Sequence, residues 1–123
     1  MLSIIIPAHN EEKYIEQCLR SIKNQKYEEY EIIVVCDSCT DKTKEIAKRY
    51  TKKAYDIKKK NVSAVRNYGA NKAKGDVLVF LDADCVIAPN LLSEIDRTIK
   101  KGYIGGVSKT KSLEPFWKAQ IMC

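Results

Sequence analysis

The feature that most constrains the fold is the alternation of short apolar runs with segments of helical periodicity. Residues 2–6, 32–36 and 77–81 form apolar runs rich in β-branched side chains, which is typical of strands buried on both faces. Each run is followed by apolar residues spaced as on one face of a helix. The alternation predicts an α/β protein with a doubly wound, mostly parallel sheet of about four to five strands and helices on both faces.

The weaker segments complete this picture. Asn10 is suited to capping a first helix that extends to about residue 25, and Ala54–Ile57 fits a short edge strand. A fifth strand is expected at residues 103–107. Because 123 residues suffice for one core, we expect a single α/β domain over residues 1–107, followed by a tail over residues 108–123.

The net charge of +6 favours an anionic partner, such as nucleic acid, a phosphorylated small molecule or an acidic lipid surface. We see no recognition-helix or RNA-binding aromatic motif, so we do not predict a nucleic-acid partner. No apolar run is long enough to cross a bilayer, and the first residues do not resemble a signal peptide. We therefore expect a cytoplasmic protein, with peripheral association at a membrane surface left open.

Two carboxylates, Asp82 and Asp84, directly follow the third apolar run. In an open parallel sheet, ligands bind at the carboxyl ends of the strands where the winding direction switches. We expect that crevice between the first strand and the strand at 77–81, lined by residues 7–11 and 82–84. Carboxylate oxygens suit a hard divalent cation, and unpaired charge beside a buried strand would require such compensation. The alternative is a turn whose aspartate caps the next helix.

Four blocks of the sequence, taken together, resemble a known family. They occupy residues 3–12, 33–41, 66–70 and 80–84, and read SIIIPAHNEE, IVVCDSCTD, RNYGA and FLDAD. In this order they resemble the family 2 glycosyltransferases of the GT-A fold. The resemblance covers most of residues 3–84 and implies a Rossmann-like, nucleotide-sugar-binding domain.

The resemblance also implies roles for individual residues and for a cofactor. It implies a UDP- or GDP-type sugar donor, a Mn²⁺ or Mg²⁺ ion, and an acceptor that is a glycan, a lipid or a protein. The residues that match the motifs are Pro7, Ala8, His9 and Glu11 around the base and ribose, Asp37 on the base, Arg66 on the nucleotide, Asp82 on the ribose or metal with Ala83 beside it, and Asp84 on the metal.

The chain departs from the family pattern in four places. His9 stands where the family often has tyrosine, Cys36 precedes Asp37 where it often has a second acid, and Ser38 and Cys39 stand where it often has Gly-Ser. Family members also continue well beyond the D-x-D block into an acceptor-binding half that usually carries the general base. We therefore expect a truncated GT-A chain with no identified catalytic base, since Glu114 is the only acid after Asp96.

The leading hypothesis is the donor-binding half of a metal-dependent glycosyltransferase. A second hypothesis is a non-catalytic nucleotide-binding or assembly module, which associates through the apolar tail residues Phe116, Trp117, Ile121 and Met122 or with a membrane surface. A third is a nucleotidyltransferase, although no glycine-rich phosphate loop follows the first apolar run.

Overall fold

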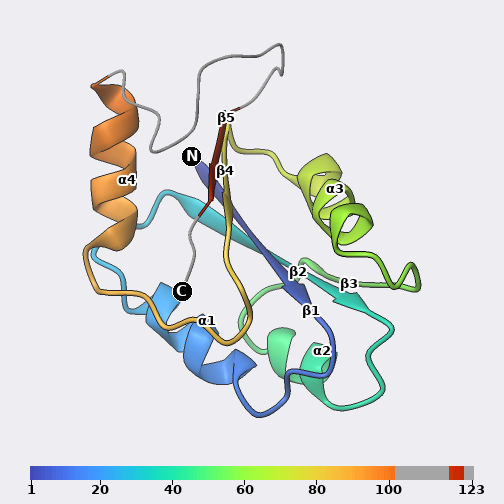
Figure 1. Cartoon of the computed structure of the whole chain (residues 1–123). Helices are drawn as coiled ribbons and strands as arrows, with labels where there is room; N and C mark the ends of the chain where they lie inside the picture. Colours follow the sequence, from blue (N-terminus) through green and yellow to red (C-terminus); the bar gives the residue numbers. More distant parts are fainter. Residues whose placement is uncertain (102–116, 121–123) are drawn as a thin grey trace.

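The computed structural model describes residues 1–101 and 117–120, which form a parallel sheet with helices on both faces (Figure 1). The sheet has five strands in the order β3-β2-β1-β4-β5, and every neighbouring pair is parallel. The predicted α/β class is confirmed. The switch point lies between β1 and β4, as the sequence predicts. The strands are β1 Leu2–Ala8, β2 Tyr30–Asp37, β3 Ala54–Ile57, β4 Val77–Phe80 and β5 Trp117–Gln120.

The helices cover the sheet unequally. Helices α1 (Ile15–Lys23), α2 (Thr43–Ala47) and α4 (Leu91–Lys100) pack on one face, and α3 (Val62–Lys72) is the one described helix on the other (Figure 1). Because side chains on a strand alternate between faces, β1 contributes to both cores. On β1, Ile4 and Ile6 enter the larger core, and Ile5 enters the smaller one. None of the described helices combines the length and the apolar character that a bilayer crossing requires.

The prediction that Asn10 caps the first helix is wrong. Helix α1 begins at Ile15, and no side chain caps it. Asn10 instead adopts a positive φ of 51° in the turn after β1. Its Oδ1 accepts a hydrogen bond of 2.8 Å from the backbone N–H of Thr40. This contact between two loops could not be inferred from the local sequence around Asn10.

Part of the segment predicted as a tail lies in the sheet. Trp117–Gln120 forms β5 and pairs with β4, placing Trp117 opposite Val77. The second hypothesis had placed Trp117 in an apolar tail through which the chain associates. The expected strand at 103–107 and the boundary at residue 107 lie outside the described residues.

Candidate functional site

A cavity of about 200 Å³ opens at the carboxyl edge of the sheet, at the predicted switch point. Residues from the ends of β1, β2 and β4 reach it, and α3 forms one wall. Val62 and Val65 were missed from the sequence, although Val62 precedes Val65 by three residues and Arg66 by four, the spacings of neighbours on a helix surface. The cavity is lined by Pro7, Ala8, His9, Glu11, Asp37, Val62, Val65, Arg66 and Asp82.

The loop after β1 is held against the loop after β2 by a series of hydrogen bonds. The backbone N–H of Glu11 donates to Thr43 Oγ1 over 2.8 Å. The thiol of Cys39 donates to the carbonyl oxygen of Ala8, with 3.6 Å between the atoms. These bonds join two segments about 30 residues apart and fix the cavity wall that contains Ala8, His9 and Glu11.

The ring of His9 has its orientation set by the neighbouring strand. Nδ1 of His9 lies 2.8 Å from the carbonyl oxygen of Asp37. Because a carbonyl oxygen only accepts hydrogen bonds, Nδ1 carries the proton in this contact. In the neutral ring, Nε2 is then left as a hydrogen-bond acceptor.

The carboxylate of Asp37 lies at the end of β2 and is almost fully buried, with 7% of the residue exposed. It accepts backbone N–H bonds from Lys59, Lys60 and Asn61 at 2.9, 3.0 and 3.1 Å. The Ser38 hydroxyl donates a fourth bond. Burial alone would raise the pKa of Asp37, but the backbone bonds from Lys60, Lys59 and Asn61 outweigh it, so the pKa is lowered from its ordinary value. Asp37 is therefore an ionised anchor for the chain that leads into α3.

Arg66 brings a positive charge to the cavity from α3. Its Nε atom is buried and has no hydrogen-bond partner among the described residues. The guanidinium carbon lies 5.9 Å from the centre of the Phe80 ring, a cation–π distance. A buried N–H without a partner is costly, and an anionic ligand in the cavity would satisfy it.

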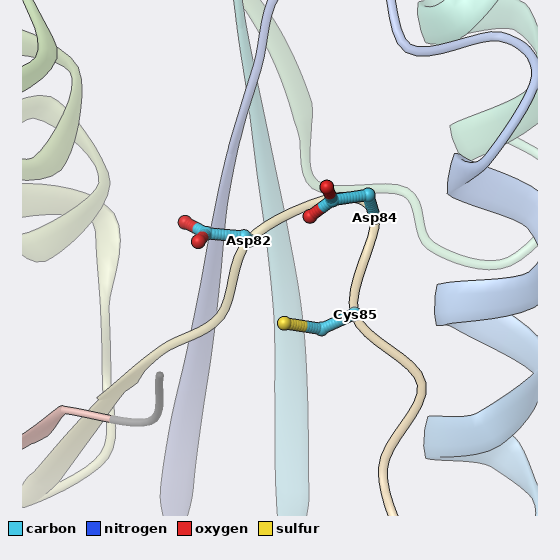
Figure 2. Close-up of side chains that lie close together, drawn as sticks. All are labelled: Asp82, Asp84 and Cys85. Atoms are coloured by element: carbon cyan, nitrogen blue, oxygen red, sulfur yellow. The ribbon is translucent and has the colours of Figure 1, made fainter. Parts of the chain in front are cut away.

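The turn after β4 carries a candidate metal site. The ligand atoms of Asp82, Asp84 and Cys85 all lie within 4.8 Å of one another, and Figure 2 shows the Asp84 carboxylate directed toward Asp82. Both aspartates are exposed, so the expectation that burial forces compensation of their charge is wrong. Neither carboxylate has a hydrogen bond or ion pair within the part of the chain that the structure describes. Hard cations prefer oxygen to sulfur, so the two carboxylates fit Mn²⁺ or Mg²⁺.

Glu11 extends this acidic region toward the cavity. Burial raises the pKa of Glu11, and the nearby charge of Asp84 raises it further. The negative charges of Glu11, Asp82 and Asp84 thus repel one another at one end of the site. A bound cation would relieve that repulsion.

Two predicted site residues lie apart from the cavity lining. Ala83 is 2% exposed and packs in the larger hydrophobic core, so its side chain does not face the cavity. Asp84 belongs to the carboxylate cluster rather than to the lining.

The fold and the site define a class of protein. An open parallel sheet with a cavity at its switch point is typical of α/β domains that bind nucleotides. Here the cavity also has an arginine nitrogen and, beside it, two carboxylates that find no partner among residues 1–101 and 117–120. The family model of glycosyl transferase family 2 matches residues 3–121. The chain therefore belongs to glycosyl transferase family 2.

Individual relatives agree with this membership. The chain is 38% identical over 93 residues to "Glycosyltransferase AglE" of Haloferax volcanii, and the match covers 68% of this chain and 30% of that protein. It is 31% identical over 109 residues to a Campylobacter jejuni protein named "GalNAc(5)-diNAcBac-PP-undecaprenol beta-1,3-glucosyltransferase", covering 83% of this chain and 35% of that one. The chain thus spans about a third of the length of these curated relatives.

Solved structures share the fold. S. aureus TarS 1-349 in complex with UDP-GlcNAc superposes with a TM-score of 0.76 at 30% identity, over 81% of this chain and 31% of that one. The mannosyltransferase PcManGT from Pyrobaculum calidifontis, in complex with GDP-Man and Mn²⁺, gives a TM-score of 0.70 at 25% identity, over 78% and 31%.

Proposed function

We propose that this chain is the donor-binding part of a metal-dependent glycosyltransferase that uses a UDP- or GDP-type nucleotide sugar. The observation that carries the proposal is the cavity at the switch point, which His9, Asp37, Arg66 and Asp82 line, with Asp84 close to Asp82 in the carboxylate cluster. The likeness to TarS with UDP-GlcNAc and to PcManGT with GDP-Man and Mn²⁺ supports it.

The lining residues suit the parts of a nucleotide. Pro7, Ala8 and Val62 provide apolar contacts for a base. In the neutral ring, Nε2 of His9 accepts a hydrogen bond, and the base N–H groups are its donors. The guanidinium of Arg66 binds phosphate oxygens, since its Nε has no partner within the described residues.

Asp82 and Asp84 are the residues that would hold the divalent ion. When bound, the ion stabilises the negative charge that the diphosphate gains as it leaves the sugar. Without it, the carboxylates of Asp82, Asp84 and Glu11 would oppose a diphosphate. Asp82 also lines the cavity and so faces both the ion and the nucleotide.

The acceptor and the cellular setting are further parts of the proposal. The name of the Campylobacter jejuni relative specifies an undecaprenol-linked acceptor, which favours testing lipid-linked glycans before proteins. We propose a cytoplasmic protein that works at the membrane surface, because the net charge of +6 attracts anionic headgroups. We assign no general base, and Glu114 lies outside the described residues.

Calorimetric titration of UDP and GDP, with and without Mn²⁺, tests the donor site. We expect the wild-type chain to bind one of the two nucleotides at least about tenfold more tightly with Mn²⁺, and Asp84→Asn to lose that gain, because even outer-shell changes cost metal affinity on this scale. The matched control is Asp76→Asn at the amino end of β4, whose side chain is 84% exposed. Equal gains in wild type and Asp84→Asn would reject the metal assignment. If the wild-type chain binds neither nucleotide, the proposed donor-binding function is wrong.

A further inference from the structure

A polar stripe on α1 is hydrogen-bonded to the loop that carries Asp82 and Asp84. It consists of Cys18, Ser21 and Gln25, which are spaced by three and four residues and so lie on one side of the helix and its C-terminal extension. All three are buried, with 0%, 8% and 8% exposed.

Two residues of the stripe, Cys18 and Ser21, each contact the loop. The thiol of Cys18 donates to the carbonyl oxygen of Asp82 over 3.6 Å. The hydroxyl of Ser21 accepts the backbone N–H of Ile87 over 3.1 Å and donates to the carbonyl oxygen of Cys18 over 2.7 Å. Ser21 thus has both its donor and its acceptor function used in joining the loop to the helix.

Gln25 holds the end of the loop and the start of α4. Its Nε2 donates to the carbonyl oxygen of Ala88 over 2.6 Å, and its Oε1 accepts the backbone N–H of Leu92 over 3.0 Å. A further bond from Nε2 to the carbonyl oxygen of Ser21 fixes the amide against α1. The side chain therefore binds both sides of the turn between the loop and α4.

The loop needs this support because it lies beyond the end of β4. In residues 81–87, side chains alternate: Leu81, Ala83, Cys85 and Ile87 are buried, while the residues between them are exposed. That alternation turns both aspartates outward on the same side. Their convergence on one ion then depends on how firmly the loop backbone is fixed.

We propose that Cys18, Ser21 and Gln25 are positioning residues that set the metal affinity of the Asp82 and Asp84 site by fixing its loop. The proposal rests on the proposed function. It adds that metal affinity is controlled from α1, by side chains that touch neither the ion nor the nucleotide.

The base end of the site provides the internal reference for a test. His9 and Asp37 belong to the β1 and β2 ends, which are held together by bonds that do not involve the stripe. A change at Gln25 should therefore alter metal binding and leave uridine binding intact. A role in general stability would alter both.

The test compares Gln25→Met with wild type, measuring Mn²⁺ affinity in the presence of UDP by electron paramagnetic resonance and uridine affinity without metal by calorimetry. We expect about a tenfold loss in Mn²⁺ affinity, with uridine affinity unchanged. Gln25→Glu should also lose Mn²⁺ affinity, since its carboxylate cannot donate and would lie against the carbonyl oxygens of Ala88 and Ser21. Ser93→Ala is the control, because it removes a hydroxyl bond at the start of α4 that is exposed and does not involve α1.

The outcomes separate the two proposals. If wild type binds Mn²⁺ and UDP and Gln25→Met binds both equally well, the positioning role is overturned while the proposed function stands. Equal losses for Mn²⁺ and uridine would show a structural role only and would also overturn it. If wild type binds neither, both proposals fall. Should Gln25→Met fail to fold, Ser21→Ala, with the same expected loss, takes its place.

Discussion

Asp37 shows how one side chain serves both the fold and the candidate site. The resemblance to the family implies that Asp37 accepts a hydrogen bond from the base, and that role stays a prediction. The structure adds that its carboxylate accepts three backbone N–H groups just before α3. Since α3 carries Val62, Val65 and Arg66, Asp37 positions a wall of the cavity even when no ligand is bound.

This dual role predicts a pH-dependent cost for Asp37→Asn. The amide cannot satisfy every N–H group that the carboxylate binds, so we expect a loss of about 1–3 kcal/mol in the free energy of unfolding at neutral pH. The pKa of Asp37 is lowered below its ordinary 3.8. Its stabilisation is therefore fully present above that value and disappears as pH falls through the lowered pKa.

Urea unfolding of both proteins from about pH 7 to about pH 3 measures this difference. The difference in unfolding free energy between wild type and Asp37→Asn should be constant near neutral pH and should shrink below the ordinary aspartate pKa. The control is Asp56→Asn, which removes an exposed ion pair with Lys44 and should cost less than about 1 kcal/mol. A gap that widens on acidification would contradict the anchoring role.

At the scale of elements, α3 is the helix whose position decides the shape of the cavity. Within the described part of the chain it is the one helix on its face of the sheet, and it contacts both β1 and β2. Gly69 allows this close approach: a Cβ at that position would lie 2.5 Å from Ile5 Cγ2 and 3.4 Å from Val35 Cγ2. Ile5 is fully buried, so its side chain has little room to move away.

Gly69→Ala is accordingly expected to push α3 away from the sheet. We predict a loss of about 1–3 kcal/mol in the free energy of unfolding from overpacking, together with weaker binding of uridine as Val62 and Arg66 shift. Urea unfolding and calorimetry measure the two effects. Asn71→Ala, at an exposed position of the same helix, should change stability by no more than about 0.5 kcal/mol. If Gly69→Ala has the same unfolding free energy and uridine affinity as wild type, the Ile5 side chain moves aside without cost and the prediction is wrong.

At the scale of the whole molecule, the parallel sheet collects residues that are far apart in the sequence. His9, Asp37 and Asp82 lie at or just after the carboxyl ends of three different strands, and the order β2-β1-β4 brings these ends to one edge. A nucleotide and a metal bound there would contact all three strand ends. Binding should stabilise the folded chain as a unit rather than one loop.

Thermal unfolding tests this linkage. With UDP and Mn²⁺ at about 100 times the dissociation constant, the wild-type chain should gain about 2.7 kcal/mol in unfolding free energy. The unfolding temperature should rise accordingly and continue to rise with ligand concentration. Asp84→Asn should gain less from the same mixture, whereas Asp76→Asn should behave as wild type. A concentration-independent unfolding temperature in wild type would contradict binding to the folded state.

Local patterns in the sequence determined the class of fold, the position of the switch point and most of the cavity lining. Uninterrupted apolar runs indicate buried strands at residues 2–6, 32–36 and 77–81. In a parallel sheet, the carboxyl ends of these strands must lie at one edge. That reasoning placed residues 7–11 beside Asp82 and Asp84, and the resemblance to the family added Asp37 and Arg66. The first run was ended too early, since β1 continues through Pro7 to Ala8.

Only the tertiary structure decided how the site is held together. Asn10 bonds to Thr40 instead of capping α1, Trp117 joins the edge of β4, and Gln25 supports a loop more than 60 residues away. The bonds of Asn10 and Gln25 leave no local pattern, because a side-chain amide can bond to any nearby backbone group, and which group is nearby depends on how the elements pack. The strand that Trp117 joins is likewise decided by the packing of the elements. The exposure of Asp82 and Asp84 likewise follows from the path of their loop over α1.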